Sequence, residues 1–553
     1  MIKIIGKFKY ELLIIIIAII VSVPLCWKTY NYYYDDGIQH IARGFLTMES
    51  MNKNQSFTVL SRLENGFGYS WDLFYGPLSS FLMAILGNIF NNILIGYKLL
   101  LSFSLFFSGI SMYCLVKKIT DDKNVGVLAS ILYMTMPYHL TDMYIRGSIG
   151  EFISFVFIPL VFLGLYNLFN ENEKDWLLVL GIVGLIITHN LMTIICILIS
   201  SVYILINLPK FKQKNIRNKF FSNIFFILCI SSFFWIPFLE TSIYTKYEVY
   251  EPGKMATIDS VQQNGLNIKQ LFITNRKEYV YELGPHILVM LCFTIAVFRR
   301  MTSNIKREYI IFLIIGFLSV FMSTKYFPWK LFGNSFSFIQ FPWRMLEISS
   351  FCFSIVCAIN MGIIIKNFRF LDVVIISIIT IIYIFGLKEF IPTIKFENTN
   401  PKDLDYEFVS GKNTDCLVGM GRNEYIPKKA YDNYFYIANR EKELIILDGL
   451  AEISELKKDG NILTAKIEIL DDKTYIELPY LYYPGYTVTI DGKKINTYES
   501  DNGFLSIGLG KLVKSDLKVE YTGTTIMKFS KLFSIISLIV FCIEIIIPKI
   551  KKK

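Results

Sequence analysis

Charged residues are scarce in this chain of 553 residues, and its cysteines show no paired spacing. Asp, Glu, Lys and Arg make up only 18%, whereas hydrophobic residues make up 53%. This balance excludes a single water-soluble core and is typical of a protein that crosses a membrane several times. The nine cysteines include no C-x-x-C spacing, so a thiol metal site or redox motif has no support. Cys416 is the one cysteine expected in a large outer domain.

Motifs of soluble enzyme chemistry are also absent. The four histidines form no H-E-x-x-H, and the chain has no P-loop, G-x-S-x-G or G-x-G-x-x-G. Zinc proteolysis, nucleotide hydrolysis, serine hydrolysis and dinucleotide chemistry therefore have no support. The chain has a net charge of +10. Its lysines are expected at the inner ends of apolar segments, where they meet anionic lipid, so no nucleic-acid partner is expected.

Long apolar segments predict a polytopic α-helical membrane protein with about twelve spans. The segment from Glu11 to Trp27 is expected to be a retained first span, because it lacks a small-x-small cleavage site. Lys and Arg collect in alternate short loops, which places both termini in the cytoplasm. The predicted spans lie near 11–27, 93–116, 124–140, 152–169, 176–189, 191–208, 219–238, 285–298, 308–323, 345–365, 370–387 and 527–547.

The segment 176–208 allows two interpretations, one long span or two short helices that turn at Thr188-His189-Asn190. A single span would leave the basic run 210–219 outside, so the two-helix form is preferred. The outer loops are then 28–92, 138–151, 240–284, 324–344 and 388–526.

Between Asn398 and Thr525 the sequence changes to alternating strands and turn signals, which predicts an extracytoplasmic β-sandwich or jelly-roll-like domain. The expected organisation is a transmembrane domain over 1–390, a β-rich domain over 391–526, and a last span with a basic tail over 527–553. The predicted strands are Glu443–Leu447, Ile462–Ile469, Thr474–Leu478, Tyr486–Ile490, Phe504–Ile507 and Leu517–Tyr521.

An acidic pair, Asp35-Asp36, opens the first outer loop. The residues that follow have helical periodicity, with Asp36, His40, Arg43 and Thr47 on one polar face. Asp36 and His40 are then neighbours four residues apart and present an acid and a phosphate-binding imidazole together. The alternative is a helix in the headgroup layer with a solvated polar face.

Charged residues also stand at the mouths of later spans, where they are costly unless paired or functional. Arg146 and Glu151 either pair with each other or hold a phosphate and an acceptor or metal, respectively. Arg344 follows Gln340-Phe341-Pro342-Trp343 and is either a snorkelling interfacial residue or a phosphate clamp. His189 lies at a predicted outer helix end, where it either makes an interfacial hydrogen bond or binds a ligand.

These features together resemble the GT-C class of membrane glycosyltransferases, which combine an acidic first outer loop, many spans and an outer C-terminal domain. Within that class, Arg146-Gly147 with Glu151, Thr188-His189-Asn190, Gln340 to Arg344 and Tyr482-Tyr483-Pro484-Gly485-Tyr486 are similar to bacterial YfhO-type and 6-pyruvoyl-tetrahydropterin-synthase-related membrane proteins. The resemblance implies sugar transfer from a polyprenyl-phosphate donor to a cell-envelope glycan or lipid acceptor, at the outer face of the bacterial plasma membrane. It implies no pterin chemistry, because four scattered histidines do not form the zinc site of that soluble enzyme.

The chemistry of inverting transfer assigns roles to these residues. A carboxylate must take the proton of the acceptor hydroxyl, so Asp35 and Asp36 are the catalytic candidates. The leaving phosphate needs positive charge or a metal, and the expected donor and acceptor contacts are His40, Arg43, Arg146, Glu151, His189 and Arg344. A divalent cation, Mg²⁺ or Mn²⁺, on Asp36 and Glu151 stays open. The rival functions are a transporter and a lipid- or glycan-handling scaffold without catalysis.

Overall fold

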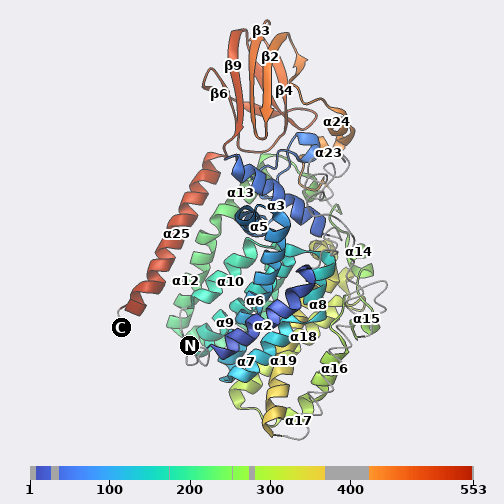
Figure 1. The fold of residues 1–553 in the computed structure, drawn as a ribbon, viewed down its shortest axis with the longest axis vertical. Helices are drawn as coiled ribbons and strands as arrows, with labels where there is room; N and C mark the ends of the chain where they lie inside the picture. The colour runs from blue at the N-terminus through green and yellow to red at the C-terminus, as the bar shows by residue number, and fades with distance from the viewer. Residues whose placement is uncertain are drawn as a thin grey trace. The chain divides into compact units, whose positions relative to one another are not determined.

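The computed structural model describes residues 8–26, 36–172, 175–251, 253–272, 281–367 and 423–550 (Figure 1). The chain separates into two compact units. The helical unit comprises the ranges 1–40, 97–227 and 256–399, and the β-containing unit comprises 41–96, 228–255 and 400–553. Asp35, Cys416, the span predicted over 370–387 and the predicted boundary at 390 lie outside the described residues.

The helical unit is built from packed apolar helices and short connecting turns. Its longer helices are α2 (Lys9–Ser22), α6 (Ile93–Thr120), α7 (Lys123–Met134), α9 (Ile149–Asn170), α10 (Trp176–Ile186), α11 (Asn190–Ile206), α12 (Lys214–Ile230), α18 (Ser303–Ser323) and α19 (Met345–Asn367). Its shorter helices are η1 (Val23–Cys26), α8 (Pro137–Thr141), η2 (Asp142–Arg146), η3 (Leu208–Lys212), α14 (Ile258–Gln263), α15 (Ile268–Phe272), α16 (Pro285–Cys292), α17 (Thr294–Phe298), η5 (Trp329–Ile339) and η6 (Pro342–Arg344).

Five described helical segments are long and apolar enough to cross a membrane: Lys9–Cys26, Ile93–Thr120, Ile149–Asn170, Pro342–Lys366 and Thr525–Ile545. The bent pair Lys214–Ile230 and Ser232–Tyr244 is a sixth candidate. The expected number of about twelve spans is therefore not confirmed for the described part of the chain. The physical reason is length, because several predicted spans form shorter apolar helices, among them Trp176–Ile186, Asn190–Ile206 and Pro285–Phe298.

The predicted interruption at Thr188-His189-Asn190 is confirmed, because α10 ends at Ile186 and α11 begins at Asn190. His189 has an extended backbone, and its Nδ1 accepts the N–H of Met192 at 3.1 Å as the N-cap of α11. Helix α10 packs closely on α9: a Cβ placed on Gly164 would lie 2.4 Å from the backbone nitrogen of Leu178. This glycine therefore lets the two backbones approach each other.

The β-containing unit combines two antiparallel sheets with helices. The first sheet has the strand order β1 (Ile445–Asp448), β4 (Thr474–Leu481), β8 (Phe504–Leu509), β7 (Thr497–Glu499), and the second has β2 (Ala451–Asp459), β3 (Ile462–Ile469), β9 (Leu512–Tyr521), β5 (Tyr486–Ile490), β6 (Lys493–Ile495). The helices are most of α3 (Gly37–Asn52), α4 (Leu63–Gly66), α5 (Leu78–Phe90), α13 (Ser232–Tyr244), η4 (Glu248–Tyr250), α23 (Lys428–Asp432), α24 (Tyr434–Asn439) and α25 (Thr525–Ile550).

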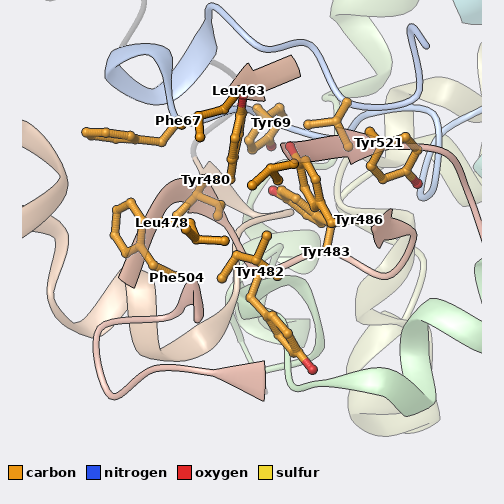
Figure 2. Packing of buried hydrophobic residues seen from close by; sticks show 14 of the residues in the cluster. Phe67, Tyr69, Leu463, Leu478, Tyr480, Tyr482, Tyr483, Tyr486, Phe504 and Tyr521 are labelled. Carbon is orange, nitrogen blue, oxygen red and sulfur yellow. The ribbon is translucent and has the colours of Figure 1, made fainter. Parts of the chain in front are cut away.

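One hydrophobic core joins the two sheets, as expected of a β-sandwich. Figure 2 shows the aromatic side chains of Tyr480, Tyr483, Tyr486 and Tyr521 gathered in this core, with Phe67 and Tyr69 from an early segment of the chain beside them. Residues between Val59 and Phe74 are therefore part of the same core as the strands. All six predicted strands are present, and β2, β6 and β7 were not predicted.

Candidate functional site

A buried carboxylate, that of Glu151, organises the charged residues of the helical unit. Glu151 lies in the first turn of α9, and its side chain is 0% exposed. Its Oε2 lies 3.1 Å from Nη1 of Arg146 and 3.3 Å from Nε of Arg344. The hydroxyl of Tyr138 donates to its Oε1. One acid therefore links two guanidinium groups from different helical segments.

Arg146 is the last residue of the π-helical turn η2, and its guanidinium contacts two further acids. Its Nη1 lies 2.6 Å from Oδ1 of Asp142, and its Nη2 lies 3.6 Å from Oδ2 of Asp36. The backbone N–H of Asp36 also donates to the carbonyl of Arg146 at 2.9 Å. We call Asp36, Tyr138, Asp142, Arg146, Glu151 and Arg344 the ionic cluster.

Exposure differs sharply among the acids of the ionic cluster. The side chain of Asp36 is 39% exposed, whereas those of Asp142 and Glu151 are 0% exposed. Gly147, which follows Arg146, has a φ of 62°, and a Cβ there would lie 2.6 Å from Cα of Gly37. The glycine therefore allows the start of α3, which follows Asp36, to approach η2 closely.

Burial and neighbouring charges shift the pKa values of Asp142 and Arg146 in the turn η2. Burial raises the pKa of Asp142 well above its usual range, and the negative charge of Glu151 raises it further. Burial opposes the charge on Arg146, but Glu151 and Asp142 outweigh it and raise the pKa of Arg146. Arg146 therefore stays a cation.

Arg344 is held against a tight turn in the segment before α19. Its Nη1 donates to Oε1 of Gln340 at 2.9 Å and to the carbonyl of Ile339 at 3.2 Å. Gln340 has φ 59° and ψ −56°, and the N–H of Phe341 donates to the carbonyl of Ile339 at 2.5 Å. These values describe a γ-turn of the rare form with positive φ. The Nη2 of Arg344 takes no part in these bonds.

Three aromatic rings are stacked beside Arg344. The ring of Trp343 stacks on Phe341 with centroids 4.4 Å apart and on Tyr281 with centroids 4.5 Å apart. The guanidinium of Arg344 also lies 5.2 Å from the ring centroid of Phe341. The ionic cluster therefore borders a rigid aromatic surface.

Two histidines belong to the surroundings of the ionic cluster. His189 is buried, and Glu151, Arg344, Arg146 and His40 all lie close enough to act on it electrostatically. The backbone N–H of His40 donates to the carbonyl of Asp36 at 3.3 Å. The structure thus gathers Asp36, His40, Arg146, Glu151, His189 and Arg344 in one region. It also contains the direct pairing of Arg146 with Glu151 that the sequence offered as an alternative.

Arg43 lies elsewhere, in the β-containing unit. Its side chain is 2% exposed and binds Asp72, with Nη2 2.5 Å from Oδ1. Thr47, on the same face of α3, is 0% exposed. The alternative of a solvated polar face therefore does not hold at Arg43 and Thr47, because Asp72 and the carbonyls of Tyr75 and Gly76 supply partners for Arg43 inside the protein. The expected contact of Arg43 with donor or acceptor stays a prediction.

The acids of the ionic cluster surround the guanidinium of Arg146. Among the described residues, no group of three or more His, Cys, Asp or Glu side chains is arranged to hold a metal ion. The guanidinium of Arg146 contacts Asp36, Asp142 and Glu151 at once. The cation that these carboxylates share is therefore an arginine side chain.

Several members of this region were not predicted from the sequence. Asp142 and Tyr138 bind Arg146 and Glu151, and Ser154 donates to Glu347 at 2.5 Å. A usable signal existed for two of them: Asp142 precedes Arg146 by four residues, and Glu347 is an acid in the first turn of an apolar helix. Tyr281 carried no such signal.

The comparisons with known proteins concern the family and the fold. Residues 73–392 match the family described as "6-pyruvoyl-tetrahydropterin synthase related domain; membrane protein". An uncharacterized protein of Lactococcus lactis subsp. cremoris is 25% identical over 350 residues, which cover 59% of this chain and 55% of that protein. The chain thus spans about half the length of this relative.

Two solved structures of oligosaccharyltransferase from Archaeoglobus fulgidus are weakly similar to this chain. The first, a complex with Zn and sulfate, has a TM-score of 0.42 at 14% identity and covers 78% of this chain and 56% of its own. The second, a complex with an inhibitory peptide and a dolichol-phosphate, has a TM-score of 0.39 at 10% identity and covers 79% and 59%.

Proposed function

This chain belongs to the family of membrane proteins with a 6-pyruvoyl-tetrahydropterin-synthase-related domain, and for it we propose glycosyl transfer. The donor is a sugar on a polyprenyl phosphate, and the acceptor is a cell-envelope glycan or lipid. The reaction takes place at the outer face of a bacterial plasma membrane. One observation carries the proposal: a half-exposed carboxylate, Asp36, stands at the edge of a buried cluster that holds two guanidinium groups.

Asp36 is the general base in this proposal. It takes the proton of the acceptor hydroxyl while that oxygen bonds to the anomeric carbon of the donor. The bond between the anomeric carbon and the phosphate oxygen breaks, and polyprenyl phosphate leaves with the electron pair. The contact of Asp36 with Arg146 and the hydrogen bond from its backbone N–H fix its position, as a base requires.

Arg344 and Arg146 stabilise the negative charge that grows on the leaving phosphate. The contacts of Arg344 use Nε and Nη1, and the remaining Nη2 is the donor that we assign to the phosphate. Glu151 and Asp142 are positioning residues, because they orient the two guanidinium groups. Guanidinium charge then does the work that a divalent cation does in other transferases.

The aromatic surface supports a sugar as the transferred group. A sugar ring has an apolar C–H face, which packs against an aromatic ring. The stack of Phe341, Trp343 and Tyr281 offers such a surface next to Arg344.

The orientation in the membrane follows from the charges at the two ends of the spans. Lys117 and Lys118 stand in the last turn of α6, and a second basic run occupies 210–219. The positive-inside rule places these ends in the cytoplasm. Glu151 stands at the opposite end of its own helix from Asn170, so the ionic cluster is assigned to the outer headgroup layer.

A transporter is the rival function. Transport sites use ionisable residues and broken helices near the middle of the bilayer. Here Glu151 lies in the first turn of α9, and Arg344 directly precedes α19. Both charges thus stand at helix ends, which favours transfer.

The decisive experiment uses purified full-length protein with radiolabelled polyprenyl-phosphate sugars. Asp36→Asn should reduce transfer by at least about a hundredfold, in line with general-base catalysis. Comparison with Asp35→Asn and the double variant shows which of the two acids is the base. Asp121→Asn is the matched control, because Asp121 is exposed and its φ of 52° suits Asn. Normal transfer by both single variants and the double would refute the assignment. Substrate flux in liposomes without transfer by wild type would favour the transporter.

A further inference from the structure

A second polar site lies at the other end of α9. A cavity of about 300 Å³ is bordered by Tyr166, Asn170, Asn172, Lys210, Arg307 and Glu308, among others. Cavities of this size accommodate small ligands. The residues come from the end of α9, the turn η3, the first turns of α12 and the start of α18, so four segments of the helical unit border one space.

Two cations at this cavity share a single neutral acceptor. Nζ of Lys210 donates to Oδ1 of Asn170 at 2.8 Å, and Nη1 of Arg307 donates to the same oxygen at 3.1 Å. A third cation, Lys219, donates to Oδ1 of Asn172 at 3.0 Å. An amide oxygen carries no charge, so these bonds orient the cations without neutralising them.

Among the described residues that line the cavity, Glu308 is the acid, and it is already engaged. Glu308 accepts the hydroxyl of Tyr203 at 2.9 Å and lies 3.3 Å from Nη1 of Arg307. Burial lowers the pKa of Lys210, and the like charge of Arg307 lowers it further. Among the described residues that line the cavity, Lys210 and Arg307 therefore outnumber the acid Glu308.

Ordinary inside-positive loops do not need this arrangement. Lys212, Lys214 and Arg217 in the same basic run are exposed to solvent, which is sufficient for the positive-inside rule. Lys210 and Arg307 instead both donate to one amide on the wall of a cavity, and Arg307 also contacts Asn207 and Glu308. Convergent donors around a polar cavity are the usual arrangement for an oxyanion.

We propose that this cavity binds a phosphate-bearing anion through Lys210 and Arg307, in the headgroup layer on the opposite side of the membrane from the ionic cluster. Helix α9 runs from Ile149 to Asn170. At ~1.5 Å of rise per residue its ends are roughly 30 Å apart, which matches the hydrocarbon thickness of a bilayer, about 30 Å. Both a phospholipid headgroup and a soluble phosphate present the same chemistry here.

The experiment uses full-length protein purified in a neutral detergent. Retention of phosphatidylglycerol is measured by native mass spectrometry against phosphatidylcholine, and inorganic phosphate is titrated calorimetrically. Lys210→Gln and Arg307→Gln should each weaken anion binding by about ten- to hundredfold, the value of a charge-assisted hydrogen bond. Lys212→Gln and Arg217→Gln are matched controls, since both residues are exposed members of the same run and should leave binding unchanged.

The outcomes distinguish a lipid phosphate from a soluble phosphate, and both of these from the absence of an anion site. Selective retention of phosphatidylglycerol identifies a lipid, whereas saturable binding of inorganic phosphate identifies a soluble ligand, and both support the site. Arg307→Lys keeps the charge and should retain most of the binding even if Arg307→Gln folds poorly. Equal binding by Lys210→Gln and Lys212→Gln would overturn the proposal.

Discussion

The buried pair Arg43–Asp72 predicts an unequal response to removal of its two partners. The side chains are 2% and 8% exposed, and Arg43 contacts Asp72 at 2.5 and 3.2 Å. Asp72→Leu leaves a guanidinium that cannot lose its proton, which should cost about 3–5 kcal/mol of stability. Arg43→Met leaves a carboxylate that can take a proton, and a carbonyl of Gly76 without its donor, so about 1–3 kcal/mol is expected.

The pH dependence follows from the same pair. Burial raises the pKa of Asp72, and the charge of Arg43 opposes this rise. An acid whose folded pKa is raised adds stability below its unfolded pKa, and that contribution is lost as pH rises through the folded pKa. Without Arg43 the folded pKa is higher still. The Arg43→Met variant should therefore be nearest to wild type in acid and lose stability toward neutral pH.

The assay is thermal unfolding of the full-length protein in detergent, followed by tryptophan fluorescence, since Trp71 adjoins Asp72 and is 7% exposed. At roughly 2–4 °C per kcal/mol, Asp72→Leu should lower the unfolding temperature by about 10 °C. The double variant should be less damaged than the sum of the singles. Glu520→Gln, which breaks the exposed pair with Lys518, is the control and should cost about 0–1 kcal/mol. Additive single effects, or a larger cost for Arg43→Met, would refute the pairing argument.

Three further predictions concern other parts of the chain. Glu477→Gln should lower the stability of the β-containing unit by about 3–5 kcal/mol, because Glu477 and Arg440 are 0% exposed and paired at 2.9 Å; proteolysis as resistant as wild type would contradict this. Gly164→Ala should cost about 1–3 kcal/mol in thermal unfolding, since its new methyl group would meet the Leu178 backbone at 2.4 Å; an unchanged midpoint would show that α9 and α10 separate freely. Transfer should be unchanged after dialysis against EDTA, because Arg146 is the cation shared by the acids; loss restored by Mg²⁺ or Mn²⁺ would reverse that assignment.

Apolar segment length and residue alternation predicted many of the helices and strands. Apolar segments of sufficient length gave the positions of α6, α9 and α19, and alternation gave the main strands of both sheets. Strand β2 was missed for a physical reason. Glu455 has a φ of 54° and the pairing with β3 shifts between Ser454 and Lys457, so a bulge breaks the alternation by which a strand is recognised.

The candidate site was only half accessible from sequence. Charges at the mouths of apolar helices are costly, so Arg146, Glu151 and Arg344 stood out by type and place alone. Their partners depend on contacts over long separations, as in the bond between Arg344 and Glu151, 193 residues apart. Arg43 shows the limit from the other side. Its position on a polar face predicted a contact with donor or acceptor, or else solvent, while its partner Asp72 lies 29 residues further along the chain.

The γ-turn at Gln340 gives Arg344 a second consequence. A backbone in this conformation is about 1–3 kcal/mol less stable than an ordinary turn, and the two bonds from Nη1 of Arg344 offset that cost. An anion bound at Nη2 that shifts the guanidinium would also weaken the two bonds from Nη1, which would release Gln340 toward an extended backbone and displace the neighbouring ring of Phe341. Occupancy at Arg344 and the position of this ring are therefore expected to change together, and the fluorescence of Trp343, which stacks on Phe341, would report it.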